Sequence, residues 1–264
     1  MGAIFSRIEQ SRTADEVIEQ VENLVLEGVL RAGDQLPGER ELARQFHVSR
    51  PILRDALKDL ERRGLLTTRH GGGTYVADVT GRVFSKAVAD LIIARPKAAT
   101  DYLEFRREIE AVTADFAARR ATADDLALLD RIVTRMQACH AAGDPEAEAE
   151  ADVEFHAAIG ECAHNIVLLH TLRSCYRLLS DGMVQSRLLV FHQPGVRDEL
   201  LRQHQAIHRA IAGRDPAGAR KAATVHIDYV MRSVAEAERT GEWQRVARLR
   251  LTQRSEGRKA KANA

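Results

Sequence analysis

Cysteine, proline and aromatic residues are all scarce in this sequence of 264 residues. It contains three cysteines, six prolines and one tryptophan, and aromatic residues make up 5% of the chain. An odd number of cysteines without paired metal-ligand spacing argues against a disulfide framework, so we expect a protein of the reducing cytoplasm. The scarcity of proline, together with abundant Ala, Leu, Arg and Glu, predicts a mainly α-helical fold.

Long apolar runs are also missing. No run approaches the roughly 20 residues that a membrane-spanning helix needs, and the first ten residues, MGAIFSRIEQ, lack the apolar segment and cleavage site of a signal peptide. We therefore expect no association with a membrane. The length leaves room for two compact domains or for one large one.

The formal net charge of +1 conceals an uneven distribution along the chain. Residues 1–39 carry three basic and eight acidic side chains, whereas residues 40–70 carry eight basic and four acidic ones. A locally basic segment suits a partner with a phosphate backbone. On charge alone, a solvated helix face explains this segment equally well.

Residues 38–76 have the pattern of two short helices, separated by a tight turn and followed by a two-stranded hairpin. The second helix has Ser49 as its N-cap and Pro51 in its first turn, where a missing amide hydrogen is tolerated. Gly64 ends this helix, and two β-prone segments flank Gly71–Gly73. Alone, three glycines would indicate no more than a tight turn. After two helices, they complete a winged helix-turn-helix.

Three arginines occupy the positions from which this motif contacts DNA. The second helix of the motif enters the major groove, where an arginine can donate two hydrogen bonds to the O6/N7 edge of guanine. Arg50 and Arg54 lie in the first turns of that helix, and Arg40 opens the helix before it. The candidate DNA-binding residues are Arg40, Ser49, Arg50, Arg54, His70 and Gly71.

The chain divides into two domains with a short connection. We assign residues 1–77 to the winged helix-turn-helix and residues 78–82 to a linker. Residues 83–240 form a bundle of six to seven helices, and residues 241–264 form a basic, flexible tail that could touch DNA phosphates. Helix starts are predicted at or next to capping and turn residues, namely Thr13, Thr100, Thr122, Asp144, Asn165, Pro194 and Asp215.

The second domain contains acidic and imidazole side chains at helical spacing. Asp152 and His156 are four residues apart and share one helix face, as do His204 and His208 on a later helix. His226 lies among apolar residues of the last long helix. A carboxylate with two or three imidazoles from three helices would suit Zn²⁺, Ni²⁺ or Mn²⁺. A surface salt bridge is the more common explanation of an Asp–His pair at this spacing.

The DNA-binding motif resembles a known family. Leu36–Ala43 (LPGERELA), Val48–Leu57 (VSRPILRDAL), Gly64–Leu66 (GLL) and His70–Val76 (HGGGTYV) are similar to the winged helix-turn-helix of the GntR superfamily of bacterial transcription regulators. By this resemblance Arg40, Arg50, Arg54, His70 and Gly71 fall at positions that contact the operator in the FadR-like subgroup. Asp55 stands where the family more often has Glu.

The second domain resembles the all-helical effector domain of the same subgroup, over roughly residues 83–238. The resemblance rests on Glu104–Glu110, on Asp152 with His156, on His204–Ile211 and on His226. In the metal-containing members, one Asp and three His line the centre of the bundle. By this resemblance the ligands of a divalent metal ion (Zn²⁺, Ni²⁺ or Mn²⁺) are Asp152, His156, His204 and His226, and the effector-binding residues are Arg106 and Asn165. His208 competes with His204 for its place.

The combined expectation is a ligand-responsive transcription regulator, a repressor of a metabolic operon. It would act as a homodimer on a palindromic operator in double-stranded DNA, because one recognition helix reads only a half-site. The ligand would be a small organic acid that binds at the metal. The alternatives are a metal-dependent enzyme that acts on such an acid and a constitutive DNA-binding protein with a structural metal.

Overall fold

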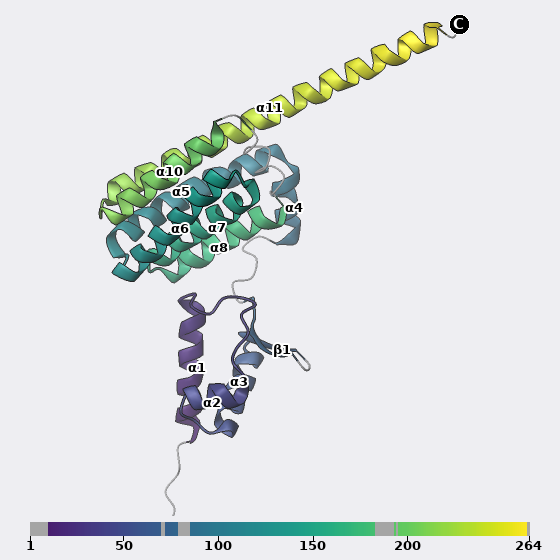
Figure 1. Cartoon of the computed structure of the whole chain (residues 1–264). Helices are drawn as coiled ribbons and strands as arrows, with labels where there is room; N and C mark the ends of the chain where they lie inside the picture. The colour runs from purple at the N-terminus through teal and green to yellow at the C-terminus, as the bar shows by residue number, and fades with distance from the viewer. Residues whose placement is uncertain (1–9, 70–71, 79–84, 183–192, 194, 263–264) are drawn as a thin grey trace, which may run out of the picture. The chain divides into compact units, whose positions relative to one another are not determined.

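The computed structural model describes residues 10–69, 72–78, 85–182, 193 and 195–262. They belong to two compact units, Met1–Val83 and Phe84–Ala264 (Figure 1). Both strands found among the described residues lie in the first unit, and the second unit is helical. The predicted fold class, a winged helix-turn-helix followed by an all-helical bundle, is confirmed.

Among its described residues, the first unit contains three helices and a hairpin in the predicted order. They are α1 (Gln10–Leu26), α2 (Glu39–Gln45), α3 (Arg50–Arg62), β1 (Leu66–Arg69) and β2 (Gly73–Val76). α1 packs on α3, and their apolar faces bury Val21, Leu53 and Leu60. The helix start predicted at Thr13 is wrong, because α1 already includes Gln10. The residues just before Thr13 are adequate helix formers and leave no reason for the helix to begin there.

A short turn sets the direction of α3. Phe46 ends α2, and His47 then adopts a positive φ of 54°, which redirects the chain. The amide of Val48 donates a hydrogen bond to the carbonyl oxygen of Ala43 (3.0 Å), and the Val48 side chain packs against the core of the unit. α3 therefore turns its apolar side inward and leaves Arg50 and Arg54 exposed.

The hairpin is tied to the segment before α2. Leu66 pairs with Val76 and Arg69 with Gly73 across the two antiparallel strands. Gln35 forms a bridge with Tyr75, and its side-chain amide donates to the carbonyl oxygen of Gly72 (3.0 Å). Gln35 thus contacts the hairpin both along β2 and in the turn between the two strands.

Gly73→Ala is expected to destabilise the first unit by about 1–3 kcal/mol, the usual range for a residue forced into a rarely populated backbone conformation. Gly73 has a φ of +97°, and a β-carbon there would lie 2.8 Å from Nε2 of Gln35. Urea unfolding followed by circular dichroism measures the loss. Gly38→Ala is the control, since Gly38 has a φ of −57° and no atom within 4 Å of the added carbon. Equal losses in both variants would show that the positive φ of Gly73 adds no cost for alanine.

The second unit contains seven helices among its described residues. They are α4 (Lys86–Ala94), α5 (Pro96–Arg120), α6 (Ala123–Ala142), α7 (Pro145–Cys162), α8 (Ile166–Gly182), α10 (Val196–Ala212) and α11 (Pro216–Ala262). α5 packs along α11, α6 along α7, and α10 against both α6 and α11. None of the described helices is long and apolar enough to cross a membrane.

Several helix ends in this unit are fixed by local sequence, as predicted. Thr122 and Asp125 form a reciprocal capping box at the start of α6, and Gly143 ends that helix in the left-handed conformation. The Asp144 side chain accepts hydrogen bonds from the amides of Glu146 and Ala147 at the start of α7. These ends place α7 antiparallel to α6, so that both helices line one side of the core.

Three predicted boundaries in the second unit differ from the structure or cannot be compared with it. α5 begins at Pro96 and not at Thr100, because a proline at the first helical position needs no amide partner. The predicted start at Pro194 lies outside the described residues. α11 continues as far as Ala262 (Figure 1), whereas a flexible tail was predicted from residue 241. This segment is rich in Arg, Ala and Leu, which are good helix formers, and the two glycines at 241 and 257 do not interrupt it.

Candidate DNA-binding surface and metal centre

The exposed side of α3 carries the two predicted recognition arginines. Side-chain exposure is 59% for Arg50 and 53% for Arg54. Glu39, at the start of α2, pairs with both, at 3.0 Å from Nη2 of Arg54 and 3.7 Å from Nη2 of Arg50. The hydrogen bond from Arg54 lowers the pKa of Glu39. Exposed ion pairs of this kind are worth about 0–1 kcal/mol, so DNA can displace Glu39 at little cost.

The other predicted DNA contacts are only partly described. Arg40 is exposed in the first turn of α2. Ser49 occupies the N-cap position of α3, but its side chain accepts no hydrogen bond from the amides of that helix. His70 and Gly71 lie outside the described residues. Beside them, the guanidinium of Arg69 stacks over the ring of Tyr75 at 4.4 Å, an exposed cation that the sequence patterns did not single out.

The four predicted metal ligands come together at the centre of the second unit. Asp152 and His156 lie on α7, His204 on α10 and His226 on α11. One ligand atom from each lies within 4.8 Å of those from the others. The three histidines are 1–3% exposed. His208 is not part of the group, because its Nε2 lies 2.8 Å from Oδ1 of Asp130.

The electrostatics of the cluster favour imidazoles in the neutral, metal-binding form. Burial lowers the pKa of His204, and burial with the nearby His204 and His156 lowers the pKa of His226 well below its usual value. A neutral imidazole nitrogen is the form that coordinates a metal ion. Nε2 of His156 and Nε2 of His204 are buried, and neither makes a hydrogen bond. Oδ1 of Asp152 lies 3.1 Å from Nε2 of His204, but without hydrogen-bond geometry.

This donor set fits a divalent metal ion. Buried polar atoms in proteins almost always have a hydrogen-bond partner, so two such nitrogens facing one carboxylate need an explanation. An ion among the four ligand atoms would satisfy both nitrogens and offset the charge of Asp152. Three imidazoles and one carboxylate suit Zn²⁺, Ni²⁺ or Mn²⁺.

Arg106, one of the two predicted effector residues, is buried behind the cluster and is 5% exposed. Its Nε donates to Oε1 of Glu110 (2.6 Å), and its Nη2 donates to the Tyr176 hydroxyl (2.6 Å). Burial by itself would raise the pKa of Glu110, but Arg106 and His156 outweigh it and hold that pKa far below its usual value. Arg106 is thus the counterion of a buried carboxylate.

Asn165, the other predicted effector residue, caps a helix. Its Oδ1 accepts a hydrogen bond from the amide of Leu168 (3.0 Å), just after the start of α8. Tyr176 of the same helix stacks on His156, with ring centroids 5.1 Å apart. Asn165 lies about 16 Å earlier along α8, at 1.5 Å per residue. The structure therefore does not bring Asn165 to the four ligands, and its effector-binding role stays a prediction.

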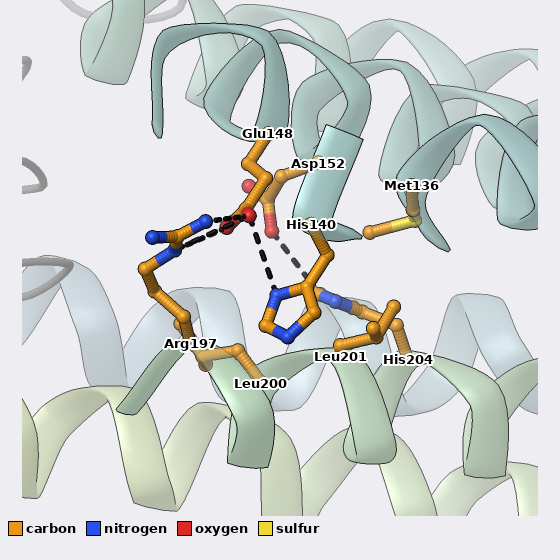
Figure 2. A pocket seen from close by; sticks show the side chains of 8 residues that line it. All are labelled: Met136, His140, Glu148, Asp152, Arg197, Leu200, Leu201 and His204. Carbon is orange, nitrogen blue, oxygen red and sulfur yellow. Dashed lines mark hydrogen bonds and ion pairs between the residues drawn. The ribbon is translucent and has the colours of Figure 1, made fainter. Parts of the chain in front are cut away.

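A small pocket of about 20 Å³, part of it open to solvent, leads to Asp152 and His204 (Figure 2). It lies between α6, α7 and α10 and is lined by Met136, His140, Glu148, Asp152, Arg197, Leu200, Leu201 and His204. Nε of Arg197 donates to Oε2 of Glu148 (2.9 Å), and Nδ1 of His140 lies 3.3 Å from Oε1 of Glu148. The sequence patterns did not single out Arg197, which lies on a different helix from its carboxylate partner.

A winged helix-turn-helix joined to a helical unit with a buried group of potential metal ligands points to a class of proteins, the DNA-binding regulators. Comparisons with known proteins agree with this class. Residues 13–76 match the model of the bacterial regulatory proteins of the gntR family, and residues 101–229 match the FCD domain. The chain belongs to the GntR family of transcription regulators, in the FadR-like subgroup that carries an FCD domain.

Individual relatives match over most of the chain. The Escherichia coli (strain K12) protein named "Putative L-lactate dehydrogenase operon regulatory protein" is 40% identical over 226 residues, which cover 83% of this chain and 85% of that protein. The "Glc operon transcriptional activator" of the same strain is 30% identical over 239 residues, covering 88% and 93%. The solved structure of Streptococcus agalactiae GntR superposes with a TM-score of 0.52 at 28% identity, over 84% of this chain and 99% of that one. The chain is therefore a DNA-binding transcription regulator and not an enzyme.

Proposed function

We propose that this chain represses a metabolic operon and that a small organic acid, bound at a divalent metal ion, controls its affinity for DNA. Asp152, His156, His204 and His226 would hold the metal. The protein would act as a homodimer on a palindromic operator, with one α3 helix in each half-site.

The observation that carries the metal part is the convergence of four ligand atoms within 4.8 Å, two of them buried nitrogens without a hydrogen bond. Four protein ligands on a six-coordinate ion leave two positions for a carboxylate or a hydroxy-acid. The names of two relatives refer to the operons of L-lactate dehydrogenase and of Glc, which supports a metabolic ligand. Lactate and related hydroxy-acids are therefore the first ligands to test.

Calorimetric titration of the protein, loaded in turn with Zn²⁺, Ni²⁺ and Mn²⁺, with lactate, other hydroxy-acids, sugar acids and dicarboxylates tests this function. We expect the wild-type protein to bind at least one of these acids and His156→Ala to bind neither zinc nor acid, because one of the four ligands is gone. His208→Ala is the matched control, since His208 pairs with Asp130 outside the ligand set. Equal acid binding by the wild type and His156→Ala would remove the metal from the proposal.

Operator binding in the presence of the same acid tests the direction of regulation. Release from DNA is expected for a repressor, whereas tighter binding would indicate an activator, the role named for one relative. A protein whose DNA affinity ignores every acid would instead be a constitutive DNA-binding protein with a structural metal. A metal-dependent enzyme is not supported, because the family and its relatives are regulators.

A further inference from the structure

We infer that Glu110 and Gln203 are positioning residues for the metal centre. Each accepts a hydrogen bond from Nδ1 of one histidine ligand and so holds Nε2 of that histidine toward the position of the metal. The inference rests on the proposed metal site. In it, Arg106 acts indirectly, by stabilising the carboxylate of Glu110.

The first of these pairs joins α5 to α7. Nδ1 of His156 lies 2.9 Å from Oε2 of Glu110, and both side chains are at most 5% exposed. A carboxylate can only accept, so Nδ1 carries the hydrogen, and the lone pair of this imidazole is then on Nε2. That nitrogen is the buried one that makes no hydrogen bond. The tautomer required for coordination is therefore already selected.

The second pair joins α10 to α11. Nδ1 of His226 lies 3.1 Å from Oε1 of Gln203. The amide nitrogen of Gln203 donates to Oε1 of Glu199 (2.6 Å), which fixes the orientation of the amide and leaves its oxygen to face His226. His226 is thus held with Nδ1 protonated and Nε2 available. Glu199 lies one turn before Gln203 on α10, so this helix itself sets the orientation of the Gln203 amide.

The two positioning residues differ in charge, and Arg106 accounts for the difference. A charged carboxylate makes an imidazole more basic than a neutral amide does, so Glu110 should strengthen the metal bond of His156 more than Gln203 strengthens that of His226. The buried charge of Glu110 is tolerated because Nε of Arg106 and the Tyr176 hydroxyl both donate to its Oε1, at 2.6 and 2.7 Å. Arg106 thereby supports the metal centre without touching the ion.

Competition titrations with a chromophoric zinc chelator test the inference. Gln203→Met removes the acceptor while keeping the length of the side chain, and Glu110→Gln keeps an acceptor but removes the charge. Loss of such a partner typically weakens metal binding about 10–100-fold, and we expect this range for Gln203→Met. We expect a smaller loss for Glu110→Gln, because it removes the charge and keeps an acceptor. Gln205→Met is the matched control, since Gln205 lies two residues from Gln203 on the same helix. Its zinc affinity should stay within about twofold of the wild type.

Glu110→Gln leaves Arg106 buried without its charge partner and can unfold the unit, so circular dichroism must accompany it. Gln203→Met carries the test if Glu110→Gln does not fold. The zinc-loaded wild-type protein is also examined by long-range ¹H–¹⁵N nuclear magnetic resonance. We expect the hydrogen on Nδ1 and the metal on Nε2 in both His156 and His226.

The outcomes separate this inference from the proposed function. Wild-type protein that binds no zinc would refute the metal site itself. Zinc binding by the wild type with unchanged affinity in Gln203→Met, or coordination through Nδ1 of His226, would overturn only the positioning role. A 10–100-fold loss in Gln203→Met with Nε2 coordination in the wild type would establish that role.

Discussion

Phe155→Ala is expected to lower the free energy of unfolding of the helical unit by about 3–5 kcal/mol, the range typical of a fully buried Phe cut back to Ala. Phe155 is completely buried in the main core cluster, among residues of α5, α6, α7, α10 and α11. Truncation removes the transfer free energy of the ring and also leaves a cavity, because close-packed neighbours relax only in part.

We expect the truncation of Phe155 to affect two of the candidate metal ligands as well. The Phe155 ring meets the rings of His156 and His204 edge-on, with centroids 5.5 and 5.2 Å apart. Without this contact the two imidazoles gain freedom, so we expect zinc affinity to fall together with stability. Denaturant unfolding by circular dichroism and the chelator titration measure the two effects.

Phe116→Ala provides the matched control for this variant. Phe116 is half-buried on α5, and the Arg120 guanidinium covers its ring at 4.2 Å. Its truncation leaves a space that solvent and Arg120 can fill, so we expect less than half of the loss found for Phe155. If both variants lost the same free energy, the central role of Phe155 in the core would be refuted.

Arg50→Ala and Arg54→Ala are each expected to cost about 1–3 kcal/mol of discrimination between the operator and single-base variants of it. Both arginines are more than half exposed, and their partner Glu39 is itself partly solvated. Their removal therefore leaves no buried unpaired charge, and the folded state should be unaffected. The operator is first selected from random oligonucleotides, and fluorescence anisotropy then measures the affinities.

Arg62→Ala is the control for the DNA experiment. Arg62 lies at the end of the same helix, where its Nε donates to Oδ1 of Asp59 (3.0 Å). Because base contacts come from the first turns of a recognition helix, this variant should keep the sequence preference of the wild type. Unchanged preference in Arg50→Ala and Arg54→Ala as well would mean that α3 does not read the bases.

Much of the fold could be predicted because its signals are local. Thr122 with Asp125, and Gly143 with Asp144, mark helix ends through side-chain and backbone chemistry confined to a few residues. The start of α5 was predicted incorrectly because Pro96 can either end one helix or begin the next. Sequence alone does not show that one helix ends and the next begins at the same residue: Arg95 is both the C-cap of α4 and the N-cap of α5.

The site was only partly predictable, for a related reason. Helical spacing alone does not distinguish His204 from His208 as a candidate metal ligand, and the family resemblance favours His204. The structure separates them by burial, with His204 2% exposed and His208 paired with Asp130. Glu110 contacts His156 from a different helix and is separated from it by 46 residues in the sequence. No local sequence pattern predicts such a contact. The partners that orient metal ligands belong to the packing of helices and become visible only in three dimensions.

α11 contributes His226 to the ligand set and then continues to Ala262, which lies 36 residues farther along the same helix. At 1.5 Å per residue, this distance is about 54 Å. One part of this helix therefore lies in the group of four candidate ligands, and its other end lies about 54 Å away. α11 still packs on the bundle at Val234 and Ala237, and Ala262 lies 25 residues beyond Ala237. A bend of about 5° in α11 just after Ala237 would therefore move its far end by about 3 Å.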